Sequence, residues 1–176
     1  MEKVLGVENP SVGLVNIGVE EKKGTEMLRD TYKLLKESEL NFIGNIEGRD
    51  IPYGAAHVFV CDGFVGNTIL KLTEGLAQRM METLRSILGK DLKTKMGAMM
   101  LMNELKELKA MMDYSEYGGA PILGVKGAVV KIHGSSNANA VKNAIVKGFP
   151  YVGNHVVNLI GNSVEENQAA EHTDAE

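Results

Sequence analysis

Apolar runs of strand length alternate with helical segments in the first half of this chain, and this alternation limits the folds open to it. The first run is almost continuously apolar between Pro10 and Gly18, which is typical of a buried strand. The alternation predicts an α/β fold, with a parallel sheet covered by helices on both faces. The expected elements are strands at 12–17, 41–43 and 58–61, a helix at 25–37, and a long helix from about Val65 or Asn67 to Leu88.

The bulk composition is that of an ordinary globular protein. The chain has 176 residues, 44% of them apolar and 24% charged, which fits one domain. A net charge of −4 gives no sign of nucleic-acid binding. Cys61 is the single cysteine, no run reaches the length of a membrane span, and the first residues lack a secretory signal. We therefore expect a cytoplasmic protein.

The middle of the chain is rich in methionine. Eight of the ten methionines lie between Met80 and Met112, and the break at residues 89–91 predicts a helical hairpin over about 78–112. Lysines lie near its tip, at Lys90, Lys93 and Lys95. One interpretation places the hairpin in the core or at a dimer interface. The other is a surface that contacts anionic lipid or an acidic protein.

The remaining residues predict a return to strands and helices. We expect a single α/β domain over 1–166, followed by an acidic, disordered tail at 167–176. The expected elements here are a turn at 117–121 leading into 122–123, a strand at 128–132, a helix at 137–147 capped by Ser136 or Asn137, and a second helix from near Pro150 to near Glu166.

In the first half of the chain a Gly-Asn pair occurs twice, each time where a predicted strand should end, at Gly44-Asn45 and at Gly66-Asn67. In open α/β sheets, ligands bind beyond the carboxyl ends of the strands, where small residues expose backbone N–H groups. Two such loops close together in the sequence predict a site for an anionic ligand, with phosphate as the favoured one.

The segment from Asp62 to Lys71 is the strongest candidate. Gly63 and Gly66 allow close approach of the backbone to a ligand, and Asp62 precedes a helix whose N-terminus favours an anion. Asn67 and Lys71 lie one turn apart on one helical face, so both side chains can reach the same point. The alternative is a tight turn with an asparagine cap and a solvated lysine.

Two further groups of polar residues follow the same logic. Asn45, Glu47 and Arg49 alternate, so a partly extended loop places all three side chains on one side. His133 ends a predicted strand, and the hydroxyls of Ser135 and Ser136 precede a helix that can bind an anion. Structural roles, in a solvated loop and at a strand end, are the alternatives. The sequence predicts neither a metal site nor a catalytic triad.

Several segments together resemble the PlsX family of bacterial phosphate acyltransferases. The resemblance covers roughly residues 4–147, and its motifs occur in the family's order. They are FIGNIEGRDI at 42–51, CDGFVGN at 61–67, Lys71 with Glu74-Gly75, VGLVNIGVEE at 12–21, YGGAPILG at 117–124 and HGSS at 133–136.

The resemblance implies an enzyme that makes acyl phosphate from acyl-(acyl carrier protein) and inorganic phosphate, for phospholipid synthesis. It implies a Rossmann-like layered sheet similar to those of phosphotransacetylases and isopropylmalate dehydrogenases, a homodimer, and no metal or redox cofactor. Phosphate is assigned to Lys71 and the Gly66-Asn67 backbone, and carbonyl polarisation to Asn67 or Asn45. His133 is expected to bind phosphate or to act as an acid.

This chain departs from the family in two ways. Family members are longer, and this chain begins near their middle, so the resemblance implies one wall of a cleft. The shorter length fits a split subunit, a gene remnant or a truncation. His57 also replaces an aspartate that is usual in the family. The alternatives in function are a non-catalytic fragment for dimerisation and carrier binding, and a short-chain phosphotransacetylase that uses coenzyme A.

Overall fold

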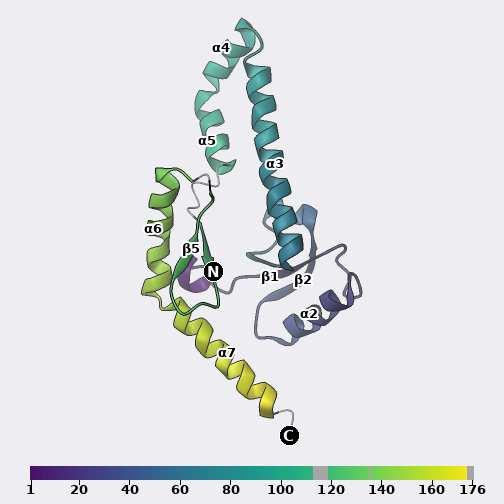
Figure 1. Ribbon diagram of the computed structural model, residues 1–176. Coiled ribbons are helices and arrows are strands. Elements are labelled where there is room, and N and C mark those ends of the chain that lie inside the picture. The colour runs from purple at the N-terminus through teal and green to yellow at the C-terminus, as the bar shows by residue number, and fades with distance from the viewer. Residues whose placement is uncertain (113–118, 135, 174–176) are drawn as a thin grey trace. The chain divides into compact units, whose positions relative to one another are not determined.

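The computed structural model describes residues 1–112, 119–134 and 136–173. Contacts divide the chain into two compact units, Met1–Leu84 and Arg85–Glu176, and each is described by itself. The chain is mixed α/β, as predicted, with a three-stranded parallel sheet and several helices (Figure 1). The single domain over 1–166 stays a prediction.

The first unit is built on a parallel sheet with the strand order β2-β1-β3. All five residues of β1 are buried, because it is the middle strand and its apolar side chains have neighbours on both sides. The strands expected at 12–17 and 58–61 are thereby confirmed. The sheet comprises β1 (Val12–Asn16), β2 (Phe42–Glu47) and β3 (Val58–Val60).

Helix α2 (Glu26–Glu37) connects β1 to β2 and confirms the helix expected at 25–37. Thr25 caps it, since its side-chain oxygen accepts a hydrogen bond from the Leu28 N–H at 3.4 Å. On the inner side, the rings of Tyr32 and Phe42 meet edge to face with centroids 5.1 Å apart. This contact fixes α2 against β2.

Strand β2 is longer than expected, which corrects the prediction that it ends at residue 43. Val12 pairs with Phe42 but Gly13 pairs with Gly44, so Ile43 is an extra residue and the strand carries a bulge. Gly44 adopts a φ of +98°, which favours glycine. Pairing with β1 then continues to the end of β2, so Asn45 lies inside a strand. The short 3-10 helix η1 (Gly48–Tyr53) follows.

Helix α3 (Gly63–Leu88) begins earlier than the expected start at Val65 or Asn67. The Asp62 carboxylate accepts hydrogen bonds from the first turn, so helical geometry starts directly after it. The Gly66-Asn67 pair therefore lies inside a helix and does not form a loop. A short helix α1 (Glu2–Leu5) at the start of the chain was not expected.

The second unit contains a two-stranded antiparallel sheet and most of the remaining helices. The break expected at 89–91 is present, and Asp91 caps the helix that follows it. A further break at Leu101 was not predicted. The elements are α4 (Leu92–Met100), α5 (Met102–Met112), β4 (Ala120–Ile122), β5 (Val129–Lys131), α6 (Ala138–Gly153) and α7 (Val156–Thr173).

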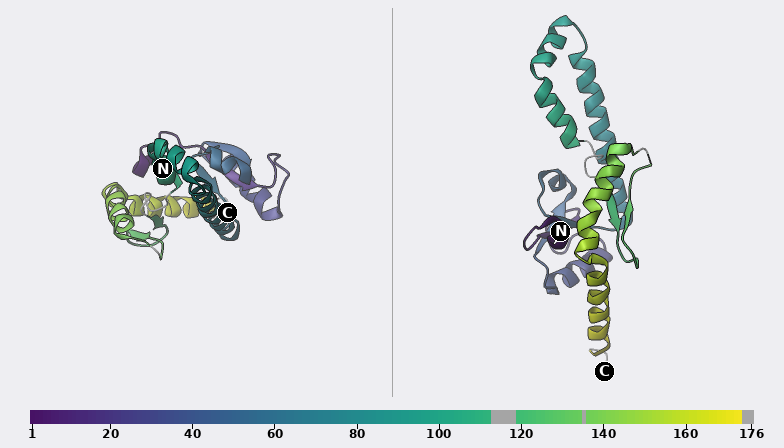
Figure 2. Two further views of the ribbon diagram at one scale, coloured as in Figure 1. Left: turned by 90° about the horizontal axis from the view of Figure 1, so that it is seen from above. Right: turned by 90° about the vertical axis from the view of Figure 1, so that its left-hand side faces the viewer.

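Helix α6 starts as predicted, because the Asn137 side chain accepts a hydrogen bond from the Ala140 N–H at 2.9 Å. The prediction that this helix ends at residue 147 is wrong, and so is the prediction that the next helix starts near Pro150, because α6 continues to Gly153. Pro150 lies inside α6, and His155, whose φ is +52°, lies between α6 and α7. The right-hand view of Figure 2 shows α6 in green followed along the chain by α7 in yellow. Proline removes one backbone donor, but its own carbonyl still accepts from the Asn154 N–H.

Some predicted features fall partly beyond the described residues. Helix α7 extends to Thr173, past the start of the predicted acidic tail, and residues 174–176 lie outside the described part. The predicted turn at 117–121 is described only from Gly119 onward. Ser135, a predicted binding residue, also lies outside the described residues.

Candidate functional site

The carboxyl ends of the three parallel strands form one edge of the first unit. Leu14 of β1 pairs with Asn45 on one side and with Val60 on the other. Because neighbouring strands lie about 4.8 Å apart, the two partners are separated by about 10 Å. The sequence-predicted residues of β2 and of the start of α3 therefore share this edge, where α/β proteins commonly bind ligands.

Asp62 satisfies the N-terminus of α3. Its Oδ1 atom accepts hydrogen bonds from the N–H groups of Phe64 and Val65, both at 2.9 Å. Its carbonyl accepts from the Gly66 N–H, also at 2.9 Å. The Phe64 and Val65 N–H groups are donors that a bound anion would use at a helix N-terminus, whereas the Gly66 N–H makes the first i→i−4 bond of the helix. The Gly66 N–H assigned to phosphate is therefore already occupied, and Asp62 has a capping role.

Gly66 has a packing role that the sequence did not reveal. A Cβ atom at this position would lie 2.9 Å from the Cys61 sulfur, so a larger residue here would force that side chain to shift. Gly63 has open space around it. Burial, and secondarily the charge of Asp62, raises the pKa of the Cys61 thiol, so the thiolate is disfavoured. Cys61 packs beneath the start of the helix.

Asn67 and Lys71 lie on successive turns of α3, and both side chains are exposed. The Lys71 ammonium forms an ion pair with Glu74 at 2.8 Å, and both partners are well exposed. Exposed pairs of this kind contribute about 0–1 kcal/mol, so an incoming anion can replace the carboxylate at low cost. The shared helical face that the spacing predicted is present.

Asn45 is buried, with only 6% of its surface exposed, and its amide is committed to the protein. Its Nδ2 donates to the Glu20 carbonyl at 2.9 Å, and its Oδ1 accepts from Asn16 Nδ2 at 3.2 Å. The same Asn16 nitrogen donates to the Lys23 carbonyl at 3.1 Å. The two asparagines thus hold the loop between β1 and α2 against the sheet.

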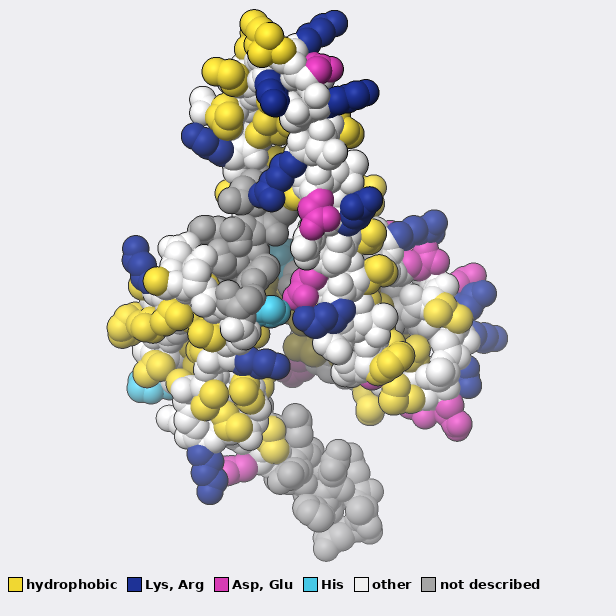
Figure 3. Space-filling model, turned by 45° about the horizontal axis from the view of Figure 1, so that its top comes forward, with side chains coloured by type: hydrophobic (Ala, Val, Ile, Leu, Met, Phe, Trp, Pro, Cys, Tyr) yellow, Lys and Arg dark blue, Asp and Glu magenta, His cyan; other side chains and the backbone are white. Residues whose placement is uncertain are grey.

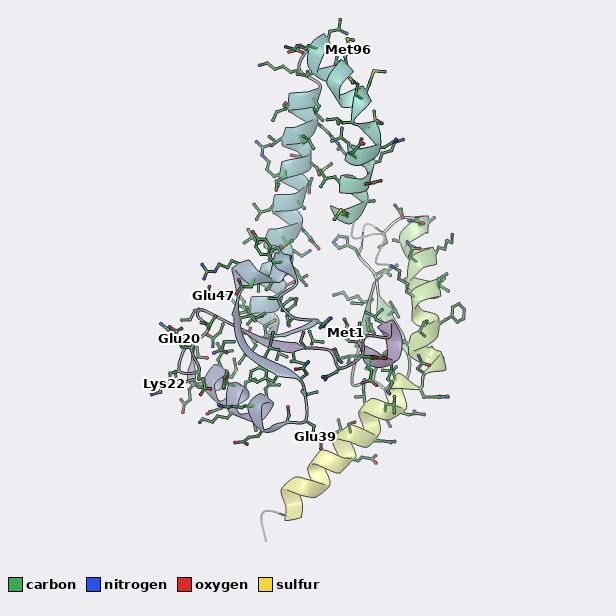
Figure 4. The ribbon with its side chains drawn as sticks, turned by 180° about the vertical axis from the view of Figure 1, so that it is seen from behind. Met1, Glu20, Lys22, Glu39, Glu47 and Met96 are labelled. Carbon is green, nitrogen blue, oxygen red and sulfur yellow. The ribbon has the colours of Figure 1, made fainter. Side chains whose placement is uncertain are left out.

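Glu47 and Arg49 form an ion pair at the end of β2. The Glu47 N–H donates to the Asp50 carboxylate at 2.9 Å, and the Glu47 side chain accepts from the Asp50 N–H, which together cap η1. Figure 4 labels Glu47 at the end of β2, and Glu20 and Lys22 on the loop after β1. Glu47 therefore lies at the predicted edge, with a local structural role.

His133 and Ser136 belong to the second unit. His133 follows β5 and is exposed, and its carbonyl accepts a hydrogen bond from the Ser136 N–H at 3.0 Å. Ser136 is half-buried just before the cap of α6. The predicted strand-to-helix connection is present at these residues. Each unit is described by itself, so the role of His133 stays a prediction.

The sequence analysis missed Asn16 and the loop that it holds. Asn16 is 7% exposed and ends β1. A lone polar residue at the end of an apolar run was the available signal, because a buried amide must find partners. Among the described residues, no group of three His, Cys, Asp or Glu side chains is placed to hold a metal ion. No described helix is long and apolar enough to cross a membrane.

Comparison with known proteins finds one matching family. A family model described as "Fatty acid synthesis protein" matches residues 1–159. Curated proteins named phosphate acyltransferase are similar to the chain over most of its length. The relative from Thermoanaerobacter pseudethanolicus is 51% identical over 164 residues, which are 93% of this chain and 49% of that protein.

Two further relatives give the same result. The phosphate acyltransferase of Alkaliphilus oremlandii is 52% identical over 93% of the chain and 49% of its own length. That of Clostridium acetobutylicum is 51% identical over 94% of the chain and 50% of its own length. The chain therefore spans about half the length of the curated relatives it matches.

Proposed function

Because the chain belongs to the fatty acid synthesis protein family, we propose that it supplies the C-terminal half of a phosphate acyltransferase. The observation that carries this proposal is the identity of about half of all aligned residues with phosphate acyltransferases over 93% of the chain. The proposed reaction joins inorganic phosphate to the acyl group of acyl-(acyl carrier protein). It yields acyl phosphate and the free carrier protein, for phospholipid synthesis.

The proposed chemistry needs three kinds of group. A phosphate oxygen attacks the thioester carbonyl carbon, the carbon–sulfur bond breaks, and the departing sulfur takes up a proton. Lys71 binds phosphate, because its ion pair with Glu74 is exposed and easily exchanged. Asn67 donates to the developing oxyanion, since its exposed amide lies one turn away on the same helix. Proton donation is assigned to His133, in the second unit, on the resemblance to the family alone.

The described contacts favour Asn67 over Asn45 for carbonyl polarisation. The Asn45 amide already binds the Glu20 carbonyl and Asn16 inside the protein. In the same way, the occupied Gly66 N–H favours phosphate binding by side chains of α3 over binding by the helix backbone. Glu47 in the first unit and Ser136 in the second remain proposed binding residues on the resemblance to the family.

The same proposal includes the type of sheet, the helical hairpin and the location of the protein in the cell. The strand order β2-β1-β3, with α2 between β1 and β2, supports a Rossmann-like layered sheet similar to that of phosphotransacetylases. The break after Leu88 supports a helical hairpin over about 78–112. The resemblance to the family supports a cytoplasmic homodimer that binds acyl carrier protein and needs no cofactor.

Helix α4 supports a peripheral contact with anionic membranes. Exposed apolar side chains and lysines occur together on this helix, and Figure 3 shows them gathered on one part of the surface. They are Leu92, Met96, Met99 and Met100, with Lys93 and Lys95. Sedimentation with anionic liposomes tests the contact, and a protein that stays wholly in the supernatant contradicts it.

The activity assay combines this chain with a polypeptide that matches the N-terminal half of a relative, and it measures acyl phosphate formation. We expect Asn67→Ala to lower kcat by about a hundredfold, the typical cost of losing one oxyanion donor. Lys71→Ala should raise the KM for phosphate. Matched controls are Gln78→Ala on the same helix and Lys33→Ala, which breaks an equally exposed ion pair with Asp30.

Two results would contradict the proposal at different levels. Near-normal turnover in both Asn67→Ala and Lys71→Ala would remove these residues from the chemistry. No acyl phosphate from the unmodified chain, alone or combined, would favour the non-catalytic role in dimerisation and carrier binding.

A further inference from the structure

The loop between β1 and α2, residues 17–24, is fastened to the sheet by buried amides. Asn16 and Asn45 hold it through the carbonyl oxygens of Lys23 and Glu20, at 3.1 and 2.9 Å. The Ile17 N–H donates back to Asn16 Oδ1 at 2.8 Å. Among the described residues that are not exposed, no buried side-chain nitrogen or oxygen is left without a hydrogen-bond partner. The network is therefore complete.

The bulge in β2 explains why Asn45 can reach this loop. Because Ile43 is an extra residue, the side chains after it point to the opposite face of the sheet from the one that regular alternation would give. Asn45 therefore pairs with Leu14 on the face that also carries Asn16. Bulges often redirect a side chain beside a functional site. The positive φ of Gly44 makes the bulge possible, and the bulge in turn directs the Asn45 side chain towards the loop.

The loop is tied at its far end as well. The Arg29 guanidinium donates to the Gly24 carbonyl at 2.7 Å. A Cβ atom at Gly24 would lie 2.5 Å from Asn16 Oδ1, so the loop passes directly over the amide. Most of its other side chains, including Glu20, Lys22 and Lys23, are exposed. The loop thus presents a charged surface at the edge where the strands end.

We infer that Asn16 and Asn45 are positioning residues, which act on the reaction by fixing loop 17–24 at the carboxyl edge of the sheet. This inference rests on the proposed function. It gives Asn45 an indirect role, because its amide shapes the surface that receives phosphate and the thioester. Displacements of about 1 Å in such a surface can cost about a hundredfold in rate.

The first test releases the loop without changing its own residues. Asn45→Asp keeps the acceptor for Asn16 but loses the donor to the Glu20 carbonyl. We expect trypsin to cleave after Lys22 and Lys23 about tenfold faster in this variant, because one buried hydrogen bond is lost. The control Asn41→Asp removes a similar amide-to-carbonyl bond, to Asn9, at the opposite edge, and should leave this cleavage unchanged.

The second test measures kinetics in the assembled enzyme. Asn45→Asp and Asn16→Asp should each raise the KM for phosphate at least tenfold. The double variant should be no worse than the poorer single variant, since both act through one loop. Gly24→Ala, whose added methyl group crowds the Asn16 amide without replacing either asparagine, should give the same change in KM. If an asparagine variant does not fold, Gly24→Ala still measures the effect of disturbing the loop on the KM.

Each outcome has a separate meaning. Unchanged cleavage at Lys22 and Lys23 in Asn45→Asp and Gly24→Ala would show that the two asparagines do not hold loop 17–24 in place. Faster cleavage with an unchanged KM and kcat would show that the loop does not serve the reaction, while the proposed function stands. An unmodified assembly that forms no acyl phosphate would overturn the proposed function, and the positioning role with it.

Discussion

The two Gly-Asn pairs in the first half of the chain, Gly44-Asn45 and Gly66-Asn67, have the same sequence but opposite surroundings. Gly44 forms a strand bulge, and Asn45 is buried with its amide bonded on both sides. Gly66 lies in the first turns of α3 against Cys61, and Asn67 is exposed. In the first pair the asparagine serves the protein's own loop, whereas in the second it is available to a ligand. The element that contains a motif decides what its side chains can do.

Replacement of the two asparagines should show the largest difference. We expect Asn45→Ala to lower the free energy of unfolding by about 2–3 kcal/mol, because it removes two hydrogen bonds and leaves buried partners unpaired. Asn67→Ala should change it by no more than about 0.5 kcal/mol. Urea denaturation of both variants measures the difference. Equal effects would contradict the contrast between buried and exposed pairs.

Replacement of Gly44 and Gly66 should give a smaller difference in the free energy of unfolding than replacement of the two asparagines. Gly44→Ala places a side chain at a φ of +98°, and we expect a loss of about 1–3 kcal/mol. In Gly66→Ala, contact with the Cys61 sulfur opposes the higher helix propensity of alanine, which is worth about 1 kcal/mol. The net change should be smaller than at Gly44.

A second substitution isolates the contact at Gly66. Combined with Cys61→Ala, Gly66→Ala should become neutral or stabilising in the same denaturation measurement, because the sulfur no longer meets the added methyl group. If the double variant stays as unstable as the sum of the two single variants, Cys61 is not the reason for the glycine.

The smallest expected effect concerns the Cys61 thiol. Burial and the Asp62 charge raise its pKa, so the reactive thiolate should form only at higher pH than for an ordinary cysteine. Alkylation by iodoacetamide, followed across alkaline pH, measures this midpoint. Asp62→Asn should lower the midpoint slightly, since burial is the larger cause. A midpoint in the ordinary range of cysteine would contradict the packing described beneath α3.

The sequence predicted those elements that depend on local signals. Strand β1 is a continuous apolar run, and α2 begins at a threonine that caps it. Asn137 likewise marks the start of α6. In each case a few neighbouring residues determine the structure. The shared helical face of Asn67 and Lys71 belongs to the same class, because helical spacing alone places them together.

The sequence did not predict features that depend on distant partners. Whether Gly44 ends a strand or forms a bulge in it depends on pairing with Gly13, about thirty positions away along the chain. Asn16 gains its importance only when Glu20, Lys23 and Asn45 meet around it. Pro150 suggested a helix start, but the bonds around it tolerate proline inside α6.

The cap at Asp62 has one more consequence, which concerns competition between anions. Helix α3 carries its own carboxylate at its N-terminus, covalently tethered to the groups that it binds. A tethered ligand acts at an effective concentration of about millimolar or more. Free phosphate would have to displace this intramolecular anion, so the cap disfavours anion binding at the end of α3.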